Sequence, residues 1–302
     1  MATFHTELER RGPGLFLRDV ARGAPDIDWV LARIADVDAD IWVLQGVDYD
    51  DGHLALGRLA AAAGYPHHFA VAPNTGVPTG LDLDKDGYSD GPRDAHGYGW
   101  FSGQGGMAIL SRYPLSLGET ASGLVWASQD WATLPEAFYS SDVLSVLRLS
   151  TTGHWRVRVD APVSFDLLTA YPTAPVFDGP EDRNGLRNAD EVRLLARMAQ
   201  RLEGPFVVAG DLNLDPLAGE GKREVMGDLL ASGLVQDALP GKPTVDFGEE
   251  SAGPLRVSYV LPSAGWTIAD AGIAWSDAPS DGEIRFTRHH PVWIDLVLEG
   301  SR

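Results

Sequence analysis

The feature that most constrains the fold is a short apolar run, FVVA at residues 206–209, which is followed at once by a glycine and then by polar side chains. We expect it to form a strand that is buried on both faces. Asp211 and Asn213 lie two positions apart, so an extended backbone points both side chains to the same side. Together they could hold a metal, a phosphate or a water, or they could simply cap the backbone of a turn.

Further apolar patterns predict helices and strands in a mixed order. Helical spacing predicts helices at residues 25–37, 54–63, 188–202 and 222–231. Short apolar runs predict strands at residues 2–8, 41–44, 68–72, 106–110, 143–149, 155–159, 165–170, 256–261, 267–273 and 292–298. We therefore expect two mixed, largely antiparallel sheets covered by helices, which is a four-layer α/β/β/α sandwich. No linker rich in Pro, Ser or Gly divides the chain, which predicts one domain over residues 1–302.

Residues 73–105 are rich in Gly, Asp and Pro, and we expect them to form a long irregular insert. Aspartates gather around a glycine in this insert: Asp82, Asp84, Asp86 and Asp90. Their spacing resembles the start of a calcium loop, although Arg93 stands where an EF-hand has its closing glutamate. The two interpretations are a structural Ca²⁺ site and a solvated acidic turn.

Composition argues against several classes of partner. The formal net charge is −19 and the arginines are scattered, whereas duplex-binding proteins carry a basic stripe, so we expect no nucleic-acid partner. The chain has no cysteine, which excludes disulfides, thiolate metal sites and cysteine nucleophiles. We find neither a signal segment at residues 1–11 nor an apolar run long enough for a bilayer, so we expect a cytoplasmic protein without a membrane partner. The oligomeric state stays open.

Several stretches occur in the order typical of one large family. They are residues 40–48, 103–114, 169–172, 210–213, 256–263 and 287–293. Together they span nearly the whole chain and resemble the endonuclease/exonuclease/phosphatase superfamily, which has the DNase-I-like fold, in a bacterial phosphatase-like branch. The resemblance implies the four-layer sandwich, a divalent metal that is usually magnesium, and hydrolysis of phosphate esters by a His-assisted water.

Most of the functional residues that this resemblance implies are replaced in the present chain. Those retained are Asp211, Asn213 and His289. The replacements are His5 for an Asn, Gly46 for the metal-binding Glu, Tyr171 for a phosphate-contacting His, Ser258 for an Asp, and Arg288 for the Asp that orients the catalytic His. Magnesium prefers oxygen ligands with an anchoring carboxylate, so Gly46 predicts no tightly bound Mg²⁺. Arg288 beside His289 disfavours the imidazolium form of that histidine.

The replacements are mostly polar groups that donate or transfer protons, which favours a reused site over a decayed one. We predict a metal-independent acid–base enzyme of the lyase, cyclase or isomerase type, acting on a small organic molecule in specialised metabolism without a cofactor at the active site. The alternatives are a ligand-binding protein without turnover and a residual Mg²⁺-dependent phosphoesterase, because fold alone does not decide function.

The expected roles divide into proton transfer and substrate binding. His289 would act as general acid or base, Tyr171 would donate a proton to a carbonyl or oxyanion, and Asp211 would orient His289 or act as a base. The substrate-binding candidates are Asn213, Arg288, His5, Ser258 and Gly46, the last by leaving space where a metal ligand is missing. The first strand would deliver His5 together with Glu7. Candidates for an apolar pocket wall are Trp42, Trp100, Trp126 and Trp131.

Overall fold

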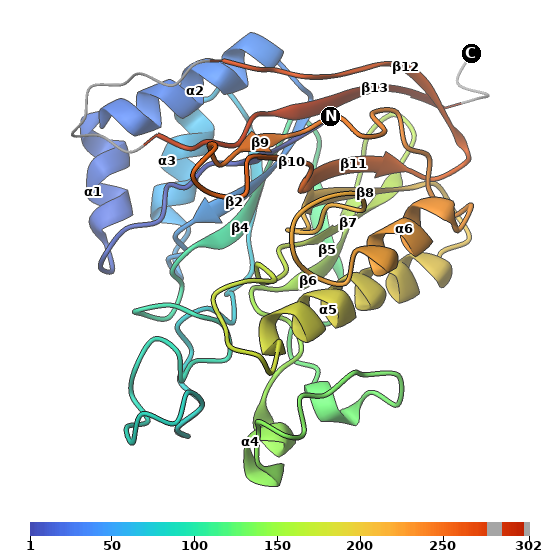
Figure 1. Cartoon of the computed structure of the whole chain (residues 1–302). Coiled ribbons are helices and arrows are strands. Elements are labelled where there is room, and N and C mark those ends of the chain that lie inside the picture. Colours follow the sequence, from blue (N-terminus) through green and yellow to red (C-terminus); the bar gives the residue numbers. More distant parts are fainter. Residues whose placement is uncertain (277–285, 299–302) are drawn as a thin grey trace.

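A computed structural model describes residues 1–276 and 286–298 of the chain. Its main strands form two sheets that pack face to face, and helices cover the outer side of each sheet (Figure 1). This arrangement confirms the predicted α/β/β/α sandwich. Among the described residues, no helix combines the length and the apolar character that crossing a membrane requires.

The first sheet has the order β12-β13-β1-β2-β4-β3. In that order the strands are Trp266–Ile273, Val292–Leu298, Ala2–His5, Ile41–Val47, Gly106–Ser111 and His67–Phe69. β1 and β2 run parallel, and the other neighbours are antiparallel. The helices α1 (Leu15–Arg22), α2 (Pro25–Val37) and α3 (Leu54–Ala62) cover its outer face. In α2, Pro25 opens the helix and Ile27, Val30 and Ile34 are buried at helical spacing.

The second sheet has the order β11-β8-β7-β6-β5. In that order the strands are Ser258–Pro262, Phe206–Asp211, Phe165–Ala170, His154–Val159 and Leu115–Thr120. Only β7 and β8 run parallel. The helices α5 (Arg183–Gln200) and α6 (Arg223–Ala231) cover its outer face. A short hairpin of β9 (Val245–Asp246) and β10 (Pro254–Leu255) lies outside both sheets.

The strand β8 lies at the centre of the packing, as the sequence predicted. Val207 and Ala209 belong to the core between the two sheets, whereas Phe206 and Val208 pack in the core beneath the helices. All of its residues are buried, so the strand has no solvated face. This burial explains the unbroken apolar run.

One predicted strand is wrong. Residues 143–149 begin within a short helix, α4 (Ser141–Val146), which Ser140 caps by accepting a hydrogen bond from the backbone N–H of Val143. Val143 and Leu147 are both buried one helical turn apart. The remaining short helix is η1 (Trp126–Ser128).

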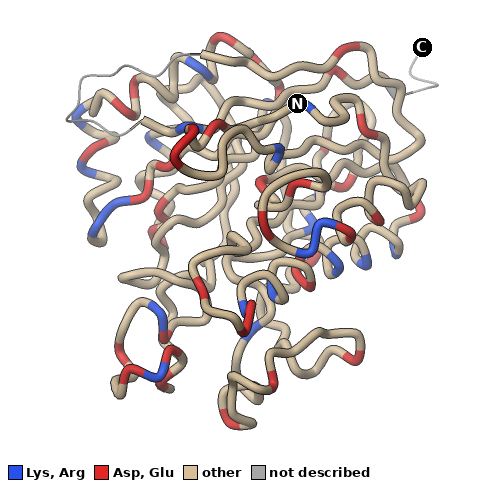
Figure 2. Tube along the Cα trace, in the orientation of Figure 1, with Lys and Arg blue, Asp and Glu red and all other residues tan. Residues whose placement is uncertain are grey.

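Other boundaries also differ from expectation. The helix α1 and the strand β5 were not predicted, α5 begins at Arg183 instead of 188, and β1 ends at His5. Residues 73–105, all of which the structure describes, contain isolated bridges but no helix or strand. Basic residues are interspersed with acidic ones along the chain, with several on α5 (Figure 2).

Candidate active site

The ends of two central strands, one from each sheet, meet at a buried ion pair. His5 is the last residue of β1 and Asp211 is the last residue of β8. The two residues are 8% and 0% exposed, and Nδ1 of His5 lies 2.6 Å from Oδ2 of Asp211. The other carboxylate oxygen accepts the backbone N–H of Asn213 at 3.1 Å. Asn213 has a positive φ of 52°, a conformation that asparagine tolerates better than most residues. This turn fixes the carboxylate against His5.

Tyr171 extends this pair into a row of three side chains. It follows β7, and its hydroxyl lies 3.0 Å from Nε2 of His5. An ionised Asp211 accepts hydrogen bonds only, so the Nδ1 of His5 donates to it and Nε2 accepts from the phenol. Burial opposes a charged His5, but the carboxylates of Asp211, Glu7 and Glu9 outweigh it and raise the His5 pKa. Burial, followed by the charge of Asp211, raises the pKa of Tyr171 well above its ordinary value.

His289 packs beside the row without joining it. Its ring centroid lies 4.2 Å from that of His5, and its Nδ1 lies 3.5 Å from Oδ2 of Asp211. Asp211 therefore makes its short bond to His5, and an orienting role toward His289 stays a prediction. Burial, then the nearby His5 and Arg288, lower the pKa of His289 well below its ordinary value, so the ring is neutral. Its Nε2 lies 3.9 Å from a carboxylate oxygen of Glu7.

The site opens into a cavity of about 980 Å³. Of the predicted site residues, those that line it are His5, Tyr171, Asn213, Arg288 and His289. Asp211 lies behind His5, fully buried. The cavity also exposes aromatic side chains that include Trp100, one of the predicted wall residues. Trp42 and Trp126 instead belong to the cores, and Trp131 packs against the core beneath α5 and α6.

Two predicted binding residues do not line this cavity. Ser258 pairs with Asp211 across β11 and β8, is 1% exposed, and faces a separate small void. Gly46 has a φ of +71°, and a Cβ at this position would lie 2.9 Å from the backbone N of Glu7 and 3.1 Å from Oε2 of Glu9. The space that the sequence suggested was free for substrate is therefore filled by the segment after β1.

Contacts among other lining residues hold the wall of the main cavity together. The guanidinium of Arg288 lies 4.9 Å above the ring of Phe247 and donates to the carbonyl of Phe247 at 3.3 Å. Asn213 donates from Nδ2 to the carbonyl of Pro172 at 2.9 Å. Glu9 and Phe247 were not found from the sequence. Glu9 continues the i, i+2 series that begins at His5 and Glu7, so that spacing was the available signal.

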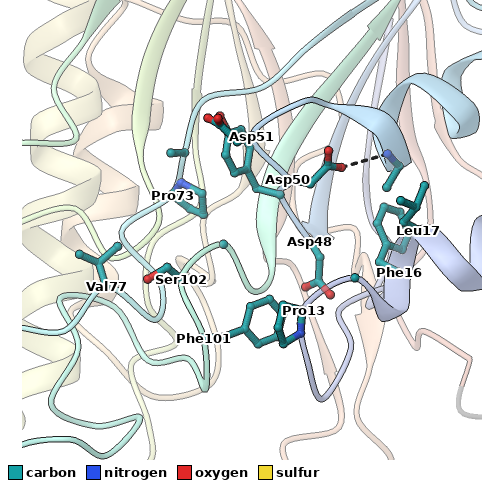
Figure 3. A pocket seen from close by; sticks show the side chains of 15 residues that line it. Pro13, Phe16, Leu17, Asp48, Asp50, Asp51, Pro73, Val77, Phe101 and Ser102 are labelled. Carbon is teal, nitrogen blue, oxygen red and sulfur yellow. Dashed lines mark hydrogen bonds between the residues drawn. The ribbon is translucent and has the colours of Figure 1, made fainter.

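A second cavity, of about 360 Å³, lies near the N-terminal end of α3 (Figure 3). Apolar side chains such as Phe16 and Phe101 line it together with Asp48 and Asp50. Asp50 accepts the backbone N–H groups of Leu54 and Ala55 at 2.7 and 2.9 Å, which caps α3.

Asp48 connects the two cavities through hydrogen bonds to the backbone. Its carboxylate accepts the backbone N–H groups of Arg10 and Gly105, both at 2.9 Å. Burial is the main reason that its pKa rises to about 6. Asp48 and Asp50 therefore both accept hydrogen bonds from backbone amides.

The aspartate-rich loop contains a cluster of carboxylate groups. One carboxylate oxygen from each of Asp82, Asp84 and Asp86 lies within 4.8 Å of the others, whereas Asp90 is not part of the group. Asp82 also accepts the backbone N–H groups of Lys85 and Gly87 at 2.6 and 2.9 Å. The loop thus forms an acidic turn, and calcium binding to it stays a prediction.

The main site can be tested against the magnesium that the resemblance implies. One ligand atom from each of His5, Asp211 and His289 lies within 4.8 Å of the others. Two of these donors are imidazole nitrogens, whereas Mg²⁺ prefers an octahedron of oxygens. The donor set therefore does not fit magnesium.

The fold and the position of this site at the strand ends define a phosphoesterase-like scaffold. A model of the Endonuclease/Exonuclease/phosphatase family matches residues 14–281, and the chain belongs to that family. No curated protein matches the chain.

Solved structures share the fold at low identity. An endonuclease/exonuclease/phosphatase from Beutenbergia cavernae DSM 12333 has 18% identity and a TM-score of 0.62, over 98% of this chain and 70% of that one. An AP endonuclease from Archaeoglobus fulgidus has 14% identity and a TM-score of 0.57, over 99% and 98%. Sphingomyelinase C from Streptomyces griseocarneus has 17% identity and a TM-score of 0.52, over 96% of each chain. These likenesses show the fold alone.

Proposed function

We propose that this chain is an enzyme that moves protons on a small organic molecule without a metal, of the lyase, cyclase or isomerase type and in specialised metabolism. The observation that carries the proposal is the row Asp211–His5–Tyr171, with contacts of 2.6 and 3.0 Å. The row ends at a phenol in the wall of a cavity of about 980 Å³. That volume suits a small organic ligand.

The row resembles a nucleophile–histidine–carboxylate triad in its connections, with a phenol in the first place. Asp211 holds the His5 proton on Nδ1, which leaves Nε2 free to take the phenolic proton of Tyr171. As that proton moves to His5, the Tyr171 oxygen can accept a proton from the substrate. The reverse transfer returns a proton to the product. A positioned acid–base pair of this kind accelerates a reaction by roughly 10²–10⁴-fold.

Neighbouring side chains would complete the chemistry. The neutral His289 lies against His5 and offers a second proton acceptor at the cavity wall. Asn213 lines the wall beside Tyr171 and would bind a substrate oxygen, although its Nδ2 already donates to a backbone carbonyl. Arg288, which also lines the cavity, would hold a polar group of the substrate.

The test is conversion in the presence of a chelator. A pool of small polar metabolites is incubated with pure protein and EDTA, and mass spectrometry records which compounds change. We expect Tyr171→Phe, His5→Gln and Asp211→Asn each to lower conversion by at least about 100-fold. Arg158→Gln, a surface change on β6, is the matched control. Wild-type rates in all three site variants would refute the mechanism.

A metal-assisted phosphoesterase is the second candidate, because His5, Asp211 and His289 could together hold an ion. Their two nitrogens favour a late first-row ion over magnesium. This candidate requires hydrolysis of bis(p-nitrophenyl) phosphate that EDTA abolishes and Zn²⁺ or Mn²⁺ restores. Activity that survives EDTA excludes it. A ligand that binds and never changes would instead support a binding protein.

A further inference from the structure

We propose that the main cavity receives an organic cation, meaning a protonated or quaternary amine attached to an apolar body. This inference names the substrate class for the proposed enzyme and therefore rests on the proposed function. The charge of the cavity wall and the aromatic side chains that line it support this proposal.

Charge in the described wall is predominantly negative. Glu7, Glu9 and Glu220 line the cavity, and Arg288 is its one described Lys or Arg side chain. A further acidic residue is Asp215, whose carboxylate oxygens accept hydrogen bonds from the backbone N–H groups of Leu217, Ala218 and Arg256. The buried Asp211 adds negative charge behind His5. An anionic group would meet net repulsion here, whereas a cation would be attracted.

Several aromatic side chains that line the same cavity are exposed to solvent. Tyr98, Trp100 and Phe177 line it and are 58%, 67% and 88% exposed. Large apolar side chains that gather around a cavity and are left in solvent mark a binding surface. The faces of Trp and Tyr rings attract cations, with Trp the stronger of the two.

Trp100 is held in place beside the acidic segment. Its backbone N–H donates to Oε1 of Gln104 at 2.7 Å, and Nε2 of Gln104 donates to the carbonyl of Arg10 at 2.8 Å. Arg10 follows Glu9 directly, so one glutamine joins the aromatic segment to the carboxylate segment. An indole and a carboxylate held on adjoining segments form the two halves of an ammonium site.

One polar atom at the site is left without a hydrogen bond. His289 lines the cavity and is 2% exposed, and its Nδ1 has no hydrogen-bond partner among the described residues. A buried polar atom without a partner costs free energy, which a bound ligand or water can recover. This nitrogen is buried and faces Oδ2 of Asp211 at 3.5 Å, so an occupant of the cavity would meet the face or edge of the ring and not Nδ1.

The experiment compares probes of one size and three charges. Isothermal titration calorimetry measures the binding of benzylammonium, benzyl alcohol and benzoate to the full chain at low salt. We expect benzylammonium to bind at least about tenfold more tightly than either of the others. Trp100→Leu and Glu9→Gln should each weaken it by about three- to tenfold. Tyr88→Leu and Glu203→Gln, which lie outside the lining, are the matched controls and should leave its affinity unchanged.

Equal affinity for the three probes, a preference for benzoate, or wild-type affinity in both site variants would overturn the inference. Tyr171→Phe separates it from the proposed function, because this change should abolish conversion and leave benzylammonium binding intact. If the selectivity appears and no compound is ever converted, the cation site stands and the enzyme proposal fails. If conversion is found for anionic substrates only, the cation site fails and the proton row stands.

Discussion

The buried carboxyl group of Glu191 should make the stability of the protein depend on pH. Glu191 lies in α5 and is 0% exposed. Its Oε2 accepts the backbone N–H of Thr173 at 2.8 Å and the hydroxyl of Thr151 at 3.1 Å. Thr173 lies two residues after Tyr171, so this carboxyl group holds the segment that carries the phenol.

Burial is the largest cause that raises the pKa of Glu191, from 4.5 to about 7. Because the folded pKa exceeds the unfolded one, the folded state holds the proton more tightly. The resulting stability is fully present below pH 4.5 and is lost as the pH rises toward 7. A shift of this size corresponds to about 3 kcal/mol in total, of which about 2–3 kcal/mol should disappear between pH 5 and pH 8.

Urea unfolding at pH 5 and pH 8 measures this loss for the wild type and for Glu191→Gln, which cannot titrate. Subtracting the two pH dependences removes the contribution of every other group. We expect the wild type to lose about 2–3 kcal/mol more than the variant over this interval. Glu203→Gln, at an exposed position, should keep the wild-type dependence. Parallel curves for wild type and Glu191→Gln, within about 0.5 kcal/mol, would refute the reasoning.

Three further predictions concern the site and the acidic loop. Asp211→Asn should present an N–H to His5 and force the other tautomer, lowering conversion by about 10²–10⁴-fold and removing the downfield Nδ1 proton from the NMR spectrum; an unchanged spectrum would contradict this. Calorimetry should show no tight Mg²⁺ binding that depends on Asp211, and plasmid should not be cleaved with Mg²⁺; metal-dependent cleavage lost in His289→Ala would show the opposite. Calcium should raise the melting temperature of the wild type, and joint replacement of Asp82, Asp84 and Asp86 by Asn should abolish that rise; a rise that persists would exclude the loop as the site.

The sequence predicted the layers of this fold because burial leaves a direct pattern. Residues 206–210 of β8 include no polar side chain because helices cover one face of the strand and the opposite sheet covers the other. The apolar positions of α2 recur at helical spacing because only one side of that helix meets the sheet. The prediction of a strand at residues 143–149 was wrong because a short run can contain both spacings. Apolar positions four apart indicate a helix, and apolar positions two apart indicate a strand. Val143 and Leu147 follow the helical spacing, whereas Leu147 and Leu149 mimic a strand.

The candidate site was predictable only in part. His5, Tyr171 and His289 come together because each ends or flanks a central strand, and strand ends can be read from the sequence. The choice of partner for Asp211 could not be read in the same way. Both imidazoles approach the same oxygen, at 2.6 Å for His5 and 3.5 Å for His289. A difference of this size depends on side-chain packing and leaves no pattern in the sequence.

The glycine at position 46 and the path of the segment after β1 depend on each other, because a side chain at position 46 would collide with that segment. Glu7 has a φ of +49°, which is uncommon for a residue other than glycine, and this turn brings residues 7–9 against β2. Gly46 permits the approach because it has no Cβ and tolerates its own positive φ of 71°. A glutamate side chain at position 46 and the present placement of Glu9 cannot occupy the same space. Where the resemblance implies a carboxylate on β2 this chain has Gly46, and the acidic residues Glu7 and Glu9 line the cavity. Negative charge in this part of the site therefore comes from Glu7 and Glu9 in the cavity wall, because the glycine at position 46 has no side chain to supply it.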